Sequence, residues 1–379
     1  MQTVNTSQLT ELFPVKKTYL YFNHASDGPL PAPSRAAVVD ALDECMNTGC
    51  MAVPKQIAVY EDIRHELSLF FNVDNENIAF IRSTSEGVLL AVLAMDIQAD
   101  ENYIVAEDAF PTTVKIMDSH CKGQMRTVRI NDARPMTDQL ERVIDAKTRA
   151  IVLDWVHFFT GKVIDIRGIT ELARRKNIFT VIDGIQGAGA LSIDLGRSNI
   201  DFFLAGGQKW LLSPQGSGFI HVSPTVWERV RRKSFGWLGY NWNDFSDFTI
   251  RPSLREGATV MEYGTRPYIA AVAFRETLRL LNRFGPDTID AHTQALRTDF
   301  SRAITDRGFK TARDEPNEKM APIVSFQSPR IDSRQLITRL REKNVVLSLR
   351  NGYIRAAFHL VNDRSEVKRF LELLEEISS

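Results

Sequence analysis

The stretch DFFLAGGQKW, residues 201–210, carries an apolar strand pattern that ends in two glycines, a glutamine and Lys209. Its aromatic and aliphatic residues suit a strand that is buried on both faces of a sheet. In an open parallel sheet, ligands bind beyond the carboxyl ends of the strands, which is where Lys209 falls. Burial lowers the pKa of an amine and makes it nucleophilic toward aldehydes. The alternative is a solvated surface lysine.

Two more polar segments follow apolar strand patterns upstream. Asp183 ends the run FTVID and precedes GIQGAGA. A carboxylate there is costly unless it is paired, so it holds a proton on a heterocyclic nitrogen or caps a helix. RSTSEG, residues 82–87, is either an anion site at a helix start or a simple cap. A hydroxyl-capped helix, then Asp-x-x-Gln, then a lysine 26 residues after Asp183 follow one another along the chain, each after its own strand. This order favours a joint role for the three segments in one site.

The rest of the chain predicts an α/β protein with a mostly parallel sheet, because strand and helix patterns alternate. The strand patterns lie at residues 77–81, 103–107, 150–154, 179–183, 201–205 and 218–222. After residue 265 we expect helices at 268–284, 289–307, 333–343 and 363–377, and strands at 323–326 and 353–357. This pattern predicts a large domain, residues 21–265, and a small α+β domain, residues 266–379. Residues 1–20 are expected to pack on the small domain or on a partner.

The composition argues against several classes of protein. Lysine plus arginine equals aspartate plus glutamate, at 47 each, so no global field gathers nucleic acid or anionic lipid. The odd, low count of three cysteines suggests a reducing cytosol, and their spacing does not suit a metal site. We see neither a signal-peptide pattern nor an apolar run long enough to span a bilayer. We therefore expect a cytoplasmic protein without a bound metal.

The order of these motifs resembles the class V branch of the aminotransferase-fold enzymes, which use pyridoxal 5′-phosphate (PLP). That branch includes cysteine desulfurases, isopenicillin N epimerase-like proteins and kynureninases. The resemblance runs from YFNHASDGP, residues 21–29, to IR at 354–355. FPT at 110–112, FFTG at 158–161, GQKW at 207–210 and GWLG at 236–239 look closest to kynureninases. It implies the PLP fold type I: a large domain with a seven-stranded, mostly parallel sheet flanked by helices, and a small C-terminal α+β domain.

The resemblance also implies roles for single residues around the cofactor. Lys209 would hold PLP as a Schiff base and later shuttle the substrate's α-proton. Asp183 would keep the pyridine nitrogen protonated, so that the ring accepts electrons. The other implied cofactor contacts are Gln186 at the phenolic oxygen, Phe110 stacked on the ring, Thr84 and Ser85 at the phosphate, Gln208 beside the lysine, and Gly264 and Thr265 reaching the phosphate from a neighbouring subunit. The last two imply a homodimer with shared active sites.

The implied substrate site centres on Arg355, which matches the arginine that takes the substrate's α-carboxylate. Asn23 would assist that carboxylate, and His24 and Trp155 are expected in the same site. Together with Trp155, further aromatic side chains suggest a roomy pocket: these are His157, Trp237, Tyr240 and Trp242. For all five, including Trp155, the alternative is core packing. For Arg355 the alternative is a surface arginine, and for Phe110 it is a core phenylalanine.

The reaction is less determined than the cofactor. Desulfurases carry a persulfide-forming cysteine in the C-terminal domain, whereas no cysteine follows Cys121 here. Desulfuration with persulfide transfer is therefore disfavoured, since the thiolate is its nucleophile. We expect Cβ bond cleavage in an amino acid or amino-acid conjugate, either by a C–S lyase (β-elimination) or by kynureninase-like C–C hydrolysis. The alternatives are an epimerase, an aminotransferase or a decarboxylating deaminase of a specialised metabolite, and then a non-catalytic homologue.

Overall fold

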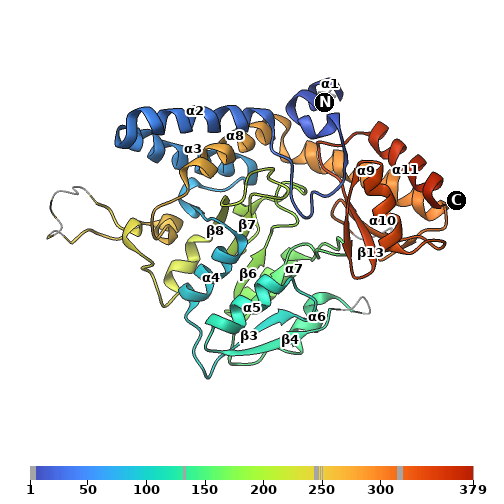
Figure 1. Ribbon diagram of the computed structural model, residues 1–379. Helices are drawn as coiled ribbons and strands as arrows, with labels where there is room; N and C mark the ends of the chain where they lie inside the picture. The colour runs from blue at the N-terminus through green and yellow to red at the C-terminus, as the bar shows by residue number, and fades with distance from the viewer. Residues whose placement is uncertain are drawn as a thin grey trace.

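A seven-stranded sheet forms the centre of the larger part of the protein (Figure 1). The computed structural model describes residues 6–130, 134–242, 247, 249, 251–313 and 319–378. The strand order is β2-β8-β7-β6-β5-β3-β4. The strands are β2 (Ile78–Phe80), β3 (Asn102–Ala106), β4 (Gln124–Val128), β5 (Thr148–Asp154), β6 (Phe179–Asp183), β7 (Phe202–Gly206) and β8 (Gly218–Val222). Only β8 runs antiparallel to its neighbours, so the predicted α/β fold is confirmed.

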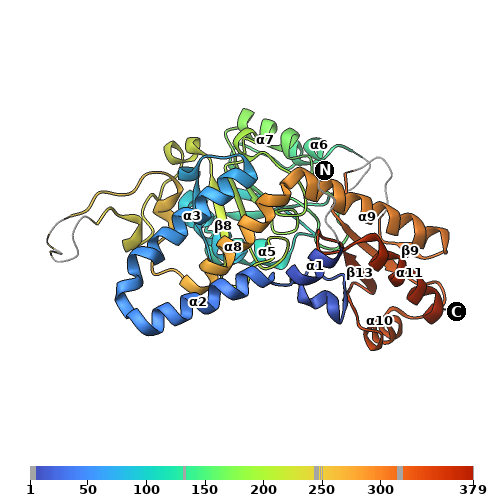
Figure 2. The same cartoon turned by 90° about the horizontal axis from the view of Figure 1, so that it is seen from above.

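Both faces of this sheet are buried under helices. Along each strand, alternate side chains enter two separate apolar clusters, as the pleat requires. Ile182 and Phe203 face the helices α3 (Val53–Phe71), α7 (Ile166–Arg175) and α8 (Tyr268–Phe284). Val181 and Phe202 face α4 (Thr84–Met95) and α5 (Pro111–His120). The remaining helices of this part are α2 (Ala32–Thr48), which packs along α8 (Figure 2), and α6 (Met136–Glu141).

A second sheet of four strands, in the order β12-β13-β10-β9, lies in the C-terminal part. Its strands are β9 (Lys310–Thr311), β10 (Ile323–Gln327), β12 (Ser348–Arg350) and β13 (Tyr353–Ala357). The helices beside it are α9 (Pro286–Asp306), α10 (Ser333–Glu342) and α11 (Arg364–Ser378). Their core is aromatic, and Phe300 stacks on Phe370 with ring centroids 5.1 Å apart.

The start of the chain joins this C-terminal part. After α1 (Thr6–Leu12), strand β1 (Leu20–Tyr21) pairs in parallel with β11 (Val345–Val346). Phe22 is fully buried against Phe370, 4.9 Å between ring centroids. The Lys16 ammonium lies 2.6 Å from a Glu366 carboxylate oxygen of α11. Residues 16–22 thus contact the C-terminal part, while the exact domain boundaries at residues 20 and 265 stay a prediction.

Candidate active site

Polar side chains stand at the carboxyl ends of three adjacent strands. β5 ends at Asp154, β6 ends at Asp183, and β7 leads through Gly207 and Gln208 to Lys209. Asp154 and Asp183 are register partners on neighbouring parallel strands. The alternation of the sheet places both carboxylates on the face covered by α4 and α5. The structure therefore places the predicted Lys209 and Asp183 together at the carboxyl ends of the central strands, with Asp154 as a second acid.

Lys209 is buried, with 8% of its surface exposed, so it is not a solvated lysine. Its ammonium lies 5.4 Å from the centre of the Phe110 ring. Burial lowers the pKa of Lys209 to about 8, against the opposing effect of the Asp183 charge. A substantial fraction of the amine is then neutral near physiological pH, and the neutral form is the one that attacks an aldehyde.

Asp183 carries an oxygen that lacks a partner. Oδ1 accepts a hydrogen bond from the N–H of Ile185 (2.9 Å), whereas the buried Oδ2 has no hydrogen-bond partner among the described residues. Burial raises the pKa of Asp183 to about 6, and the Ile185 N–H and the Lys209 charge oppose that rise. A buried carboxylate oxygen without a donor is costly. A protonated ring nitrogen would supply that donor, so this carboxylate fits a pyridinium.

The start of α4 has the features of an anion site. Ser83 caps the helix by accepting a hydrogen bond from the N–H of Glu86 (3.2 Å), and the Thr84 hydroxyl accepts one from Gly206 N–H (3.0 Å). The N–H groups of Thr84 and Ser85 are in the first turn, which has no acceptors of its own within the helix. This arrangement and the helix dipole suit a phosphate. The hydrogen bond to Gly206 ties that site to the end of β7.

Glutamines occupy two positions beside the lysine. The Gln186 side chain is buried; its Oε1 accepts from the Trp210 indole N–H (3.0 Å) and its Nε2 donates to Ala25 O (3.0 Å). One of the two Nε2 hydrogens stays available for a ligand oxygen. Gln208 folds back over Gly206, where an added Cβ would lie 2.4 Å from Gln208 Oε1. A larger residue at position 206 would displace that amide from the Thr84 side of the site.

Arg355 on β13 is a buried cation with neutral partners. Its guanidinium donates to Phe158 O (2.6 Å), Ser26 Oγ (2.8 Å) and Ser348 Oγ (3.2 Å). Within the described part of the chain, no carboxylate lies at ion-pair distance from it. Burial, and then the charge of Arg350, lowers the pKa of Arg355 to about 9. A buried cation without an anion is costly, so this group fits a carboxylate ligand.

Two predicted substrate residues, Asn23 and His24, follow β1 and have different surroundings. Asn23 bridges to Ala357 beside Arg355, and its buried Oδ1 has no hydrogen-bond partner among the described residues. His24 is fully buried between the rings of Tyr21 and His359, each at a centroid distance of 5.2 Å. The structure therefore gives Asn23 a free acceptor near the arginine, whereas His24 packs among aromatic rings and its substrate role stays a prediction.

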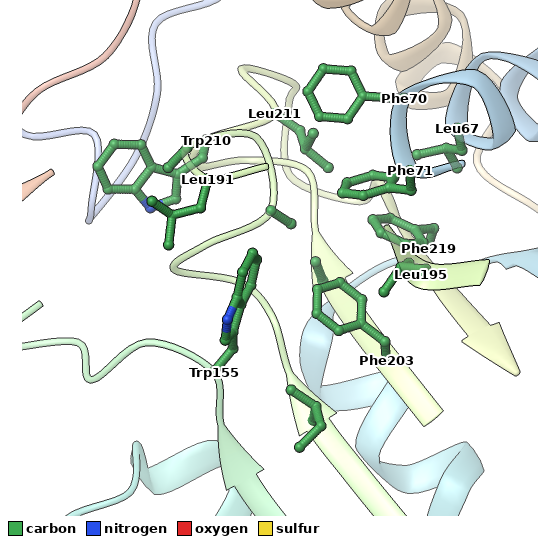
Figure 3. Close-up of a cluster of buried hydrophobic side chains, with 14 of the residues drawn as sticks. Leu67, Phe70, Phe71, Trp155, Leu191, Leu195, Phe203, Trp210, Leu211 and Phe219 are labelled. Atoms are coloured by element: carbon green, nitrogen blue, oxygen red, sulfur yellow. The ribbon is translucent and has the colours of Figure 1, made fainter. Parts of the chain in front are cut away.

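Trp155 also lies in the core. It is 3% exposed and belongs to the same buried cluster as Phe203 and Trp210 (Figure 3). Its ring covers Gly187, where an added Cβ would meet the indole at 2.3 Å. The aromatic residues Trp237 and Trp242 lie on the segment after β8, where the Trp242 indole donates to Trp237 O (2.7 Å). The burial of Trp155 fits the packing alternative, and the substrate roles of Trp155, Trp237 and Trp242 stay predictions.

Gly264 and Thr265 line a small cavity with Arg82 and Glu86 of the same chain, close to the start of α4. Glu262 anchors this segment, since its buried carboxylate accepts from Arg64 Nη1 (2.5 Å) and from Phe80 N–H (2.9 Å). The predicted contact from a neighbouring subunit stays a prediction.

Sequence reasoning missed Asp154 and His359. Asp154 accepts a hydrogen bond from the Phe110 N–H (2.7 Å) and one from the Thr113 hydroxyl (3.2 Å), which holds the start of α5. The signal for Asp154 was present, because it ends an apolar strand just as Asp183 does. His359 contacts the carbonyl of Trp210, and no sequence pattern links two residues 149 positions apart.

The fold and the site together define a PLP-dependent enzyme class, the fold type I enzymes. More particularly, the chain belongs to the class V aminotransferase family, whose model matches residues 46–370. The predicted family is thereby confirmed, and so is its cofactor, PLP. The residues that fit this group are Lys209 and Asp183 with the start of α4.

Relatives of the chain carry different names. An uncharacterized aminotransferase of Bacillus subtilis, YcbU, is 23% identical over 365 residues, which covers 96% of both chains. Isopenicillin N epimerase of Streptomyces clavuligerus is 25% identical over 346 residues, 86% of this chain and 85% of the relative. A probable cysteine desulfurase of Methanothermobacter thermautotrophicus is 21% identical over 402 residues, 99% and 98% of the two chains.

Solved structures share the fold over nearly the whole chain. A mutant of C-DES with glycine covalently linked to its PLP cofactor superposes with a TM-score of 0.88 at 20% identity, covering 96% of this chain and 98% of that one. The complex of the cystine C–S lyase C-DES with its product cysteine persulfide gives a TM-score of 0.87 at 20% identity, covering 97% of this chain and 100% of that one.

Within the described residues, no group of three or more His, Cys, Asp or Glu could hold a metal ion. Of the helices described, none has the length and apolar character needed to cross a membrane.

Proposed function

We propose that this protein is a PLP-dependent lyase that cleaves a bond at Cβ of an amino acid or amino-acid conjugate. The observation that carries the proposal is the buried Asp183 Oδ2 without a donor, at the same sheet edge as the buried amine of Lys209. A carboxylate and an amine so placed suit a cofactor with a basic ring nitrogen and an aldehyde. The preferred reactions are β-elimination by a C–S lyase and kynureninase-like C–C hydrolysis.

Each residue has a defined task in this proposal. When bound, PLP supplies an electron sink for the bonds at Cα. Lys209 supplies the amine that holds the cofactor and then takes the proton from Cα, because its lowered pKa suits a general base. Asp183 holds the proton on the ring nitrogen through Oδ2. Arg355 orients the α-carboxylate with Asn23 beside it, and Phe110 covers the ring.

The choice of Cβ chemistry rests on two points. The chain has no cysteine after Cys121, which removes the nucleophile of ordinary persulfide transfer. A solved protein of the same fold is named a cystine C–S lyase. Because relatives include probable cysteine desulfurases, the test must separate elimination from desulfuration. We would incubate the PLP-loaded protein with S-substituted cysteines and kynurenine, and measure pyruvate and alanine. If neither product forms, Cβ cleavage of these substrates is ruled out.

Epimerisation is the second candidate, favoured by the similarity to isopenicillin N epimerase over 86% of this chain. Both reactions begin with removal of the Cα proton by Lys209, and the fate of the next bond separates them. In heavy water, an epimerase places deuterium at Cα without net product, whereas Cβ cleavage releases pyruvate from an S-substituted cysteine or alanine from kynurenine. Mass spectrometry of the recovered amino acid distinguishes the two. Transamination and decarboxylating deamination remain within this second group.

A cytoplasmic homodimer with shared sites is part of the proposal. Large apolar side chains along α2 and α3 are exposed, among them Leu42 (50%), Met46 (76%) and Ile57 (53%). Leu42 and Met46 are one helical turn apart, so they share a face that a second copy would cover. Sedimentation velocity of the wild type and of Leu42→Asp/Met46→Asp tests this. A monomeric wild type that keeps PLP contradicts the shared site.

A further inference from the structure

The turn that carries Lys209 is held at three successive carbonyl groups. Gln208 O accepts from the Gly28 N–H (2.7 Å), and Lys209 O accepts from the Leu212 N–H (3.3 Å). Trp210 O accepts from His359 Nε2 (2.8 Å). Gly28 belongs to the N-terminal segment and His359 follows β13, so two distant parts of the chain meet at this turn. The outer two of these hydrogen bonds therefore come from outside the large sheet.

His359 is suited to this contact by its tautomer. The Leu360 N–H donates to His359 Nδ1 (2.8 Å), so Nδ1 is the acceptor and Nε2 carries the hydrogen that Trp210 O receives. The ring is fully buried and stacks on the Trp210 indole at a centroid distance of 5.8 Å. Burial lowers the pKa of His359 to about 4, so the ring stays neutral at physiological pH.

Trp210 extends the connection into the large sheet. Its indole N–H donates to Gln186 Oε1 (3.0 Å), and Gln186 lies three residues beyond Asp183. Gly189, with φ of 97°, leaves room for the same carbonyl, since an added Cβ would lie 2.4 Å from Trp210 O. A chain of two hydrogen bonds thus runs from His359 through Trp210 to Gln186. It links the loop after β13 to the loop after β6.

We propose that His359 is a positioning residue that fixes Lys209 through the Trp210 carbonyl and connects the lysine to Arg355, four residues earlier on β13. This inference rests on the proposed function, because the position of Lys209 relative to Arg355 matters only if the lysine holds the cofactor and the arginine binds the substrate's carboxylate. His359 touches neither cofactor nor substrate; it acts through the peptide that follows the lysine. A displaced lysine meets the cofactor aldehyde and the Cα proton less well, whereas Arg355 keeps its own three partners.

The test compares His359→Leu, which removes the donor, with His359→Gln, whose amide retains an N–H at a similar reach. His292→Gln is the matched control: His292 Nε2 also contacts a backbone carbonyl, Asn362 O at 2.8 Å, but not the lysine turn. The measurements are PLP dissociation, the pH midpoint of the visible band of lysine-bound PLP, and kcat and KM separately. Melting temperatures of the PLP-free proteins report on folding.

For His359→Leu we expect about fivefold weaker PLP binding, from the loss of one hydrogen bond worth about 1 kcal/mol. The midpoint of the visible band should shift, and kcat should fall while KM stays within about twofold. His359→Gln should restore all three properties, and His292→Gln should match the wild type. If His359→Leu only lowers the melting temperature, or if His359→Gln fails equally, the inference is wrong.

Should His359→Leu not fold, His359→Phe takes its place, because it keeps an aromatic ring against Trp210 but has no donor for the Trp210 carbonyl. It should shift the same midpoint, and an unchanged midpoint overturns the inference. Failure of the proposed function is distinguishable: then wild-type protein forms neither pyruvate nor alanine, whereas the effects of His359→Leu on PLP dissociation and on the visible band are measured without turnover.

Discussion

Lys209 should capture PLP with a pH dependence set by its burial. The pKa of Lys209 is lowered to about 8, against 10.5 for an ordinary lysine. At pH 7 about 9% of the amine is then neutral, compared with about 0.03% for an ordinary lysine. The nucleophilic fraction is therefore roughly 300-fold larger at this position. Because the neutral form is lost as pH falls through the pKa, the capture rate should drop about tenfold between pH 7 and pH 6.

Stopped-flow mixing of PLP with cofactor-free protein between about pH 6 and about pH 11.5 measures that rate at the visible band, a range that covers both pKa values. A blocked lysine amino acid in the same buffers controls for titration of PLP itself. Borohydride reduction and peptide mass spectrometry should place the adduct on Lys209, and Lys209→Ala should lose both the adduct and nearly all turnover. A capture midpoint near 10.5, or an adduct that persists in Lys209→Ala, would falsify the assignment.

Three further predictions concern the neighbours of the lysine. Asp183→Asn should lower the pH midpoint of PLP capture below 8, because the Asp183 charge raises the pKa of Lys209. The same variant should bind PLP more weakly, and a pH midpoint that rises would contradict this reasoning. Arg355→Gln should raise KM roughly 100-fold, as two charge-assisted hydrogen bonds to a carboxylate are lost, with PLP retention unchanged; an unchanged KM removes Arg355 from the substrate site. Thr84→Val should weaken PLP about tenfold and leave pyridoxal, which lacks the phosphate, bound as before; an equal loss of both ligands argues against a phosphate contact.

The sheet was predictable where its strands are buried and poorly predictable at its edge. β6 was located from the run FTVID, because a strand covered on both faces is apolar throughout. β4 was missed: Gln124–Val128 is largely exposed at the edge of the sheet and reads as polar. The topology, with β8 antiparallel between β2 and β7, has no signature in single strand patterns.

The candidate site divides in the same way. Lys209 and Asp183 were found because a charged group at the end of an apolar strand is unusual and needs a partner. Trp155 was expected in the substrate site from the family resemblance; its burial in the core cluster with Phe203 fits the packing alternative, because a short motif does not fix which face of the sheet a side chain takes. His24 packs among aromatic rings, and its role in the substrate site stays a prediction, because short motifs do not encode the direction of a side chain. His359 escaped notice since its contact with Trp210 is made only by the tertiary fold.

The pairing of Leu20 with Val345 has a consequence for the order of biosynthesis. During translation β1 leaves the ribosome long before β11 is synthesised. Phe22 therefore lacks its aromatic neighbours until the C-terminal part of the chain has been made. An exposed apolar segment of this kind is one that chaperones bind during translation. Deleting the first two dozen codons would accordingly harm the last elements to be made as much as the first.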